Sequence, residues 1–379
     1  MKNYPWEKWV PGVLSNIQIK KLVDDGYIRN LEKYPDDIGY SSFDLHLKSE
    51  VYEMTQGAIK PNGAHYAKDY LRNPKFSRKI PPESDNNFKL WKKHTYVIPL
   101  EEEFAYPSEL AKAQICGQAT AKSSIGRVDV LARLIVDGTN EYESFKFNDL
   151  EKSSGQLFLE VTPITFNVRV KGGIGLSQLR LFLGEPSESE VDSKILFKNT
   201  LKDSSNTDNT LSVNLMSVLI NKKEVVAYKA KETEEVVQLW DENSHDPNQF
   251  WETVGLTFEE PEHRFQIDKG SFYILRSFEK ISLPESIAVY CKAMDESLGE
   301  MRIHYAGFVH PYFGFDRDDG EKGTPLIFEV RGHDVFVNLV HREKLAKLIF
   351  YRMSQNPLKG KTEKYDTQDL TLSKFFRQF

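Results

Sequence analysis

The chain repeats itself at an offset of roughly 170 residues, and this repeat limits the folds that it can adopt. With a shift of 169 positions, residues 157–182 fall on residues 326–351 without a gap, so that LFLEVTPITFNVRV aligns with LIFEVRGHDVFVNL. Upstream, a shift of 177 aligns YVIPLEEEFAYPSELA (96–111) with YILRSFEKISLPESIA (273–288), and a shift of 173 aligns KSSIGR (122–127) with DESLGE (295–300). Three blocks in one order predict a tandem duplication of one domain.

The repeated blocks have the composition of strands. They are short and rich in β-branched and aromatic residues, as in YVIPL, LFLEV, FNVRV and VFVNLV. A helix is predicted in SNIQIKKLVDDG (15–26), where Ser15 or Asn16 is the N-cap and Gly26 ends the helix. We therefore expect a mainly β fold with a few short helices, in two domains of residues 1–190 and 191–379. Their boundary lies in the polar stretch GEPSESEVDSK (184–194).

Composition excludes several classes of protein. The 379 residues are 40% hydrophobic and 28% charged, which is typical of a globular protein. A net charge of -6 argues against nucleic acid as a partner, and no apolar run approaches the ~18 residues of a membrane span. The N-terminal sequence lacks the apolar core of a signal peptide, and two cysteines give no disulfide framework. A cytoplasmic protein is expected.

Several metal and nucleotide motifs are missing from the sequence. It contains no CxxC, no HExxH and no HxE followed by PCxxC, so a zinc site of the usual deaminase or protease kind is not expected. It also contains no GxGxxG and no GxxxxGK[ST], which leaves Rossmann and P-loop nucleotide binding unsupported.

The segment KSSIGR combines two cations with two hydroxyls. Lys122, Ser123, Ser124 and Arg127 are the donors that a polyphosphate needs, and Gly126 permits a tight turn. The residues alone leave a solvated polar turn open as the alternative. The second copy, DESLGE, keeps a Ser-Leu-Gly core but has carboxylates where the cations stand, and these would repel phosphate. We therefore predict a phosphate site in the first half only.

Several segments together resemble a known family. SSFDLHL (41–47), YPSELAKAQICGQATAKSSIGR, GQLFLEV followed by LSQLRLF, and the C-terminal EKYDTQDLTLSKFF are similar to the dCTP deaminase branch of the dUTPase-like fold. The full length resembles the double-length bacterial members. The resemblance implies a β-clip, distorted jelly-roll fold and a homo-oligomer. It also implies hydrolysis of dCTP to dUTP and ammonia without a protein-bound zinc ion, with Mg²⁺ carried by the triphosphate.

The resemblance leaves other activities open. Relatives that also hydrolyse dUTP, plain dUTPases and a catalytically silent nucleotide-binding homologue are the alternatives. In dUTPases the key acid is an Asp in a different motif, so the Glu in FLEV favours deamination of dCTP. The product would supply dUTP for thymidylate synthesis.

The resemblance also implies roles for single residues. Glu160 is the expected general base, and Ser123 would help to hold the water or the base of the nucleotide. In the C-terminal tail, Lys364 would contact the phosphates and Gln368 the nucleotide. Apart from the resemblance, Asp137 in RLIVDG is expected either to orient the sugar or base or to cap a turn.

The residues themselves support these roles only in part. Glu160 shares a strand face with Phe158, so partial burial would raise its pKa, although an exposed strand carboxylate is equally compatible with the pattern. Glu329 is its repeat counterpart and is expected to be structural, because the second copy lacks the cations. His310, in place of the family's Asp before Pro, likewise indicates a scaffolding second half. The tail is expected to add little to the core, and His46 is assigned no role.

Overall fold

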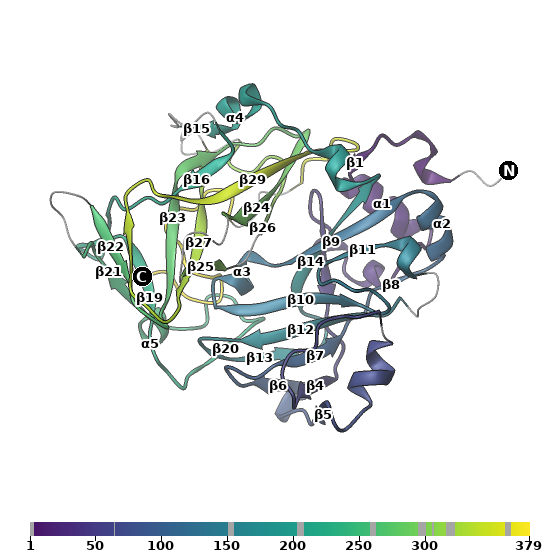
Figure 1. Cartoon of the computed structure of the whole chain (residues 1–379), viewed down its shortest axis with the longest axis horizontal. Coiled ribbons are helices and arrows are strands. Elements are labelled where there is room, and N and C mark those ends of the chain that lie inside the picture. The colour runs from purple at the N-terminus through teal and green to yellow at the C-terminus, as the bar shows by residue number, and fades with distance from the viewer. Residues whose placement is uncertain are drawn as a thin grey trace.

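The computed structural model describes residues 4–63, 65–150, 155–202, 208–257, 263–294, 301–304, 307–315, 323–360 and 365–379. Residues 84 and 301–304 are described by their backbone alone. Two halves, each built from antiparallel sheets, lie side by side in Figure 1.

The first half contains two main sheets. One has the order β10-β12-β7-β4-β5, and the other has the order β1-β14-β9-β11, with β3 paired to β14. The first sheet consists of β10 (Val130–Val136), β12 (Leu157–Pro163), β7 (Tyr96–Pro99), β4 (Val51–Met54) and β5 (Ser77–Ile80). The second consists of β1 (Gly12–Val13), β14 (Gly175–Leu183), β9 (Ile115–Ala121), β11 (Ser144–Lys146) and β3 (Phe43–His46).

The second half repeats this arrangement. Its sheets have the orders β25-β27-β23-β19-β21 and β16-β29-β24-β26, with β15 paired to β23. The first consists of β25 (Met301–His304), β27 (Thr324–Gly332), β23 (Phe272–Ile281), β19 (Ala227–Ala230), β21 (Trp251–Val254) and β15 (Leu201–Lys202). The second consists of β16 (Thr210–Ser212), β29 (Lys344–Arg352), β24 (Ile287–Ala293) and β26 (Gly307–Val309). Strands β14 and β29 differ by 169 positions at both ends, as the repeat predicts, so the duplication and the mainly β class are confirmed.

Smaller sheets complete the β structure. β20 (Val236–Gln238) pairs with β13 (Asn167–Lys171), which also pairs with β6 (Asn87–Leu90). The remaining pairs are β17 (Val218–Ile220) with β18 (Lys223–Val225), β2 (Ile28–Arg29) with β8 (Glu103–Phe104), and β22 (Arg264–Ile267) with β28 (Val337–Val340). Because β20 belongs to the second half and β13 to the first, backbone hydrogen bonds link the halves.

The helices of the described residues are short. They are α1 (Asn16–Asp24), α2 (Pro107–Lys112), α3 (Ser123–Gly126), α4 (Lys194–Thr200) and α5 (Pro247–Phe250), with a π-helical turn at η4 (Ala67–Leu71). The 3-10 turns are η1 (Pro5–Lys8), η2 (Leu31–Lys33), η3 (Pro35–Asp37), η5 (Ser84–Asn86), η6 (Phe147–Leu150) and η7 (Pro186–Ser189). α1 is the helix expected from the sequence, and it begins after Ser15, whose backbone N–H donates to the Gln18 side chain at 3.0 Å.

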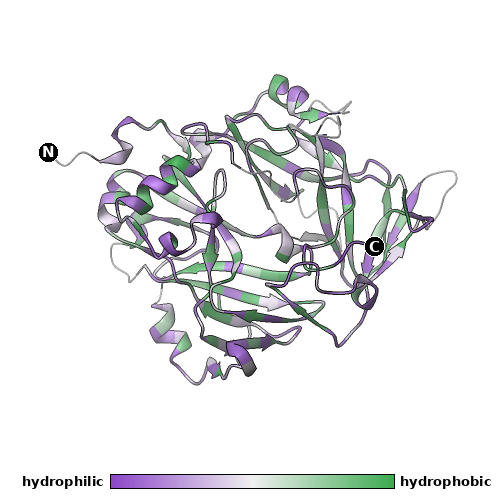
Figure 2. Ribbon diagram, turned by 180° about the vertical axis from the view of Figure 1, so that it is seen from behind, coloured by the Kyte–Doolittle hydropathy of each residue, from purple (hydrophilic) through white to green (hydrophobic). Residues whose placement is uncertain are grey.

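The core extends across both halves and includes the C-terminal tail. One apolar cluster combines first-half residues such as Leu159 and Phe166 with Trp251 of the second half and with Leu372 and Phe376 of the tail. Figure 2 shows hydrophobic colour along the strands and hydrophilic colour in many of the loops. The expectation that the tail adds little to the core is therefore wrong, whereas the domain boundary between residues 190 and 191 stays a prediction.

Candidate functional site

A cavity of about 370 Å³ lies where the two halves meet. Its walls include Lys122 to Ser124 from the first half, Glu329 and His310 from the second half, and Gln368 from the tail. The volume is within the usual range for small-molecule sites, which is about 300–1,000 Å³. Figure 1 shows α3, which follows Lys122, at the junction of the halves. The second half therefore contributes directly to the cavity, contrary to the expectation of a pure scaffold.

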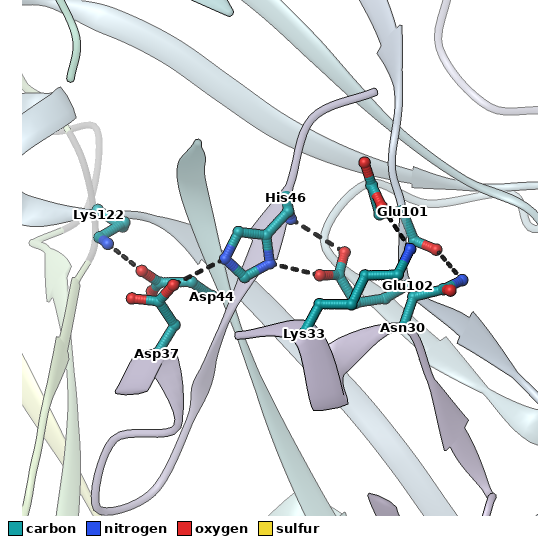
Figure 3. Close-up of polar contacts among 8 residues, drawn as sticks. All are labelled: Asn30, Lys33, Asp37, Asp44, His46, Glu101, Glu102 and Lys122. Atoms are coloured by element: carbon teal, nitrogen blue, oxygen red, sulfur yellow. Dashed lines mark hydrogen bonds and ion pairs between the residues drawn. The ribbon is translucent and has the colours of Figure 1, made fainter. Parts of the chain in front are cut away.

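The hydroxyls and the ammonium of the KSSIGR segment are presented at the start of α3. Ser123 is exposed, whereas Ser124 is buried and its carbonyl accepts a hydrogen bond of 2.7 Å from the Ser373 hydroxyl. The Lys122 ammonium pairs with the carboxylate of Asp44, as Figure 3 shows. The structure therefore brings Lys122, Ser123 and Ser124 to one cavity, as the sequence predicted, but it also places an acidic partner beside the cation.

Arg127 is more deeply buried than a surface arginine that binds phosphate would be. Its side chain is buried, and one terminal nitrogen donates to the carbonyl of Thr371 at 3.1 Å. The other terminal nitrogen donates to the Gln368 side chain, and the guanidinium stacks on the Tyr365 ring, 4.0 Å from its centroid. Arg127 therefore binds the C-terminal tail, and it also lines the cavity with Lys122, Ser123 and Ser124, so its expected contact with phosphate stays a prediction.

Glu329 is the buried carboxyl group of the cavity. It lies in β27, is 6% exposed, and accepts no hydrogen bond from any residue that the structure describes. Burial raises the pKa of Glu329 to about 8, although Arg127 opposes the rise, and Asp129 adds to it. A carboxyl group that titrates near neutral pH is suited to act as a general base.

Glu160 has different surroundings from its repeat counterpart. It lies in β12 opposite Arg133 of β10, and the Arg133 guanidinium forms an ion pair with it, with the Nε nitrogen 3.1 Å from the carboxylate. The Tyr142 hydroxyl donates a third hydrogen bond at 3.0 Å. Glu160 does not line the cavity that holds Lys122 and Ser123. The structure thus separates the expected base from the expected phosphate site, and it brings Glu329 to that site instead.

The other expected site residues have mixed outcomes. Asp137 is buried away from this cavity, where its carboxylate accepts a hydrogen bond of 2.6 Å from the Tyr66 backbone and faces the His65 ring at 3.5 Å. Asp137 therefore fixes the backbone just before η4 and does not line the cavity. Gln368 lines the cavity and donates to the Pro325 carbonyl at 3.0 Å. Lys364 lies outside the described residues.

The sequence did not indicate a site role for the cavity residues of the second half outside the tail, or for those of the loop before β3. Glu329 was recognisable only as the counterpart of Glu160 at the shift of 169. His310 lines the cavity with its Nε2 nitrogen 3.0 Å from the Asp366 carboxylate of the tail. Asp37 and Asp44 also line it; Asp37 lies in none of the recognised sequence segments, and Asp44 lies in SSFDLHL, where it was assigned no role. Among the described residues, no group of three or more His, Cys, Asp or Glu side chains could hold a metal ion.

The fold and the cavity together define a duplicated, mainly β protein with a cavity lined by charged and polar side chains of both halves. Two family models match the chain, the 2'-deoxycytidine 5'-triphosphate deaminase N-terminal domain over residues 10–185 and its C-terminal domain over residues 187–376. The chain belongs to the 2'-deoxycytidine 5'-triphosphate deaminase family.

The comparison with solved structures agrees with this family. The chain is similar to the crystal structure of 2'-deoxycytidine 5'-triphosphate deaminase from Agrobacterium tumefaciens, at 26% identity and a TM-score of 0.78. The similarity covers 90% of this chain and 99% of that chain. A search of curated proteins gives no match. In the part of the chain that the structure describes, no helix is long and apolar enough to cross a membrane.

Proposed function

We propose that this protein hydrolyses dCTP to dUTP and ammonia. One observation supports the proposal most strongly: Glu329 of the second half lines the same cavity as Lys122 and Ser123 of the first half. A buried carboxyl group with a pKa of about 8 supplies a general base, and the ammonium and hydroxyl supply contacts for a nucleotide. Membership in the dCTP deaminase family supports the choice of substrate.

Glu329 moves the protons in the proposed reaction. Its carboxylate takes a proton from water as the water oxygen bonds to C4 of cytosine, and it returns that proton to N3. It then carries the proton of the new hydroxyl to the amino group, so that ammonia leaves and the C4 carbonyl forms. Glu329 ends as a carboxylate, ready for another cycle. Burial favours these transfers because it brings the pKa of the carboxyl close to neutral pH.

The other cavity residues bind the nucleotide in this proposal. Lys122 and Ser123 bind the phosphates, while Arg127 holds Gln368 and Tyr365 of the tail against the site. Mg²⁺ arrives with the triphosphate, as is usual for nucleotide substrates. We propose chemistry without zinc because the sequence carries none of the zinc motifs of hydrolytic deaminases or proteases. The dUTP formed would enter thymidylate synthesis.

Paired glutamine variants test the proposal. Purified protein is incubated separately with dCTP and with dUTP, and ammonia and pyrophosphate are measured. We expect ammonia from dCTP, a loss of at least ~100-fold in kcat for Glu329→Gln, and dCTP binding that is retained. Glu160→Gln is the matched control, because it changes the equivalent strand position outside the cavity, and it should keep most of the turnover.

Two results would contradict the proposal. Pyrophosphate release from dUTP without ammonia from dCTP would identify a dUTPase, and neither product would indicate a silent nucleotide-binding protein. If Glu160→Gln were inactive and Glu329→Gln fully active, the general base would be Glu160 of the first half.

A further inference from the structure

We propose that Glu102, His46 and Asp37 form a charged relay, running from the buried pair Glu102 and His46 to the half-buried Asp37, that limits the negative charge beside Lys122 so that this side of the cavity can bind a polyphosphate. In this relay His46 is a positioning residue, which acts through Asp37 and the neighbouring Lys122 and does not touch the nucleotide. The inference rests on the proposed function, because it assigns the phosphates to Lys122. Figure 3 shows the network from which it is drawn.

His46 is held between two carboxylates. Its Nδ1 nitrogen lies 2.5 Å from Glu102, and its Nε2 nitrogen lies 2.9 Å from Asp37. With Glu102 and Asp37 ionised, both carboxylates only accept hydrogen bonds, and in this arrangement each ring nitrogen donates a proton and the ring is an imidazolium. The ring is fully buried and stacks on Tyr34 with centroids 3.5 Å apart, while the His46 backbone N–H donates to Glu102 at 2.9 Å.

The relay ends at the cavity. Asp37 is the last residue of η3 and His46 is the last residue of β3, so their hydrogen bond joins η3 to β3. Asp44 lies in β3, two residues before His46. Both carboxylates line the cavity, and the Lys122 ammonium pairs with Asp44. Lys122 is also close enough to help His46 lower the pKa of Asp37. Lys122 therefore lies beside two carboxylates, and the same cavity is also lined by Asp36, Glu242 and Lys374.

The charge of His46 changes the net charge of the relay and its two neighbours, Asp44 and Lys122. Asp37, Asp44 and Glu102 contribute three negative charges, and His46 and Lys122 contribute two positive charges, so the sum is -1. A neutral residue at position 46 makes the sum -2. A triphosphate carries about four negative charges, so each added negative charge beside it weakens binding. Glu329 lines the same cavity, but the charges that act on its carboxyl group are those of Arg127 and Asp129, so we expect the proton transfers to be unchanged.

Binding of inorganic tripolyphosphate tests the relay without needing turnover. Calorimetry on the full chain compares the wild type with His46→Gln, Glu102→Gln and the double variant. We expect His46→Gln to weaken binding about 10-fold. The double variant returns the sum to -1, so its affinity should lie within about threefold of the wild type. Glu102→Gln alone should bind no more weakly than the wild type.

The control is Lys33→Met at the far end of the same network. Lys33 pairs with Glu101 at 3.1 Å on the surface, and its loss should change tripolyphosphate affinity less than about twofold. Equal affinity of the wild type and His46→Gln would overturn the inference. A loss that the double variant fails to restore, or weaker binding by Glu102→Gln, would show a packing role only. Failure of the proposed function is a separate result, the absence of ammonia from dCTP with the wild type.

A kinetic measurement separates positioning from folding. In His46→Gln we expect the KM for dCTP to rise about 10-fold while the KM for deoxycytidine and kcat stay within about twofold. If His46→Gln melts at a much lower temperature, Glu102→Gln, which keeps His46, still decides between charge and packing through its tripolyphosphate affinity. Equal rises in KM for the nucleoside and the triphosphate would contradict the relay.

Discussion

Glu160 and Glu329 occupy the same position of a repeated strand, yet their carboxylates have different neighbours. In the β10–β12 ladder the residue opposite Glu160 is Arg133, which pairs with it, and in the β25–β27 ladder the residue opposite Glu329 is His304. Arg127 is close enough to oppose the rise in the pKa of Glu329 without hydrogen bonding to it. Among the described side chains, Glu160 therefore forms an ion pair across its ladder, whereas Glu329 accepts no hydrogen bond and stays a candidate base.

The pH dependence of turnover follows from Glu329. Its ionised form is the base, so kcat/KM for dCTP should rise with pH and level off above about 8. Arg127→Met removes a cation that lowers this pKa, so the rising limb should move to higher pH. Arg127→Lys keeps the charge and is the control. A limb that does not move in Arg127→Met would show that another group controls the rate.

The stability of the His46 relay should also depend on pH. Burial alone would lower the pKa of His46, but its bonds with Asp37 and Glu102 raise it to about 9, and Asp44 and Tyr34 are its other titratable neighbours. A raised folded-state pKa contributes stability that is fully present below pH ~6.5 and is lost as the pH rises through about 9. Urea unfolding should therefore show His46→Gln less stable than the wild type at pH 6, with a gap that narrows by pH 9.5. A gap independent of pH would contradict this linkage.

At the scale of elements, the C-terminal tail has two tasks. Tyr365 and Gln368 contact Arg127 beside the cavity, whereas Leu372, Phe375 and Phe376 are buried in the shared core. Backbone hydrogen bonds between residues 243–245 and the tail fix it further. The tail is therefore both a wall of the site and a part of the fold.

Substitutions within the tail should separate these tasks. Phe376→Ala removes a fully buried ring, and we expect the free energy of unfolding to fall by about 3–5 kcal/mol. Gln368→Ala should cost about 1–3 kcal/mol, because it leaves an Arg127 donor unpaired, and it should reduce kcat/KM for dCTP. The exposed Gln378→Ala is the control and should change neither quantity. Chemical denaturation and ammonia release measure both, and a Phe376→Ala protein of unchanged stability would refute the packing.

At the scale of the whole molecule, the halves depend on each other. Arg331 of the second half pairs with Asp129 of the first half, and Arg180 of the first half donates to the Val289 carbonyl of the second half at 3.1 Å. The Arg180 guanidinium also stacks on Phe308, a cavity residue, 4.0 Å from the ring centroid. Together with the shared apolar cluster, these contacts make the interface part of the site.

Fragments test this dependence. Residues 1–190 alone would expose the surface that Trp251, Phe272 and Phe376 cover, so we expect the fragment to be unfolded or aggregated. Residues 191–379 should behave likewise. Mixing the two fragments should restore folded protein and some ammonia release, as measured by circular dichroism and product assay. A fragment 1–190 that folds and melts cooperatively by itself would show two independent domains.

The sequence alone determined the duplication, the main strands, helix α1 and the Lys122–Ser124 contribution to a cavity, because each depends on local spacing and residue type. Only the tertiary structure decided which glutamate meets that segment, since LFLEV and LIFEV are equivalent within their own strands and the choice depends on how the halves pack. It also decided the place of the tail, whose apolar residues are too sparse for a strand or helix pattern. Their burial comes from surfaces distant in the chain, and the shape of those surfaces exists only once both halves have folded together.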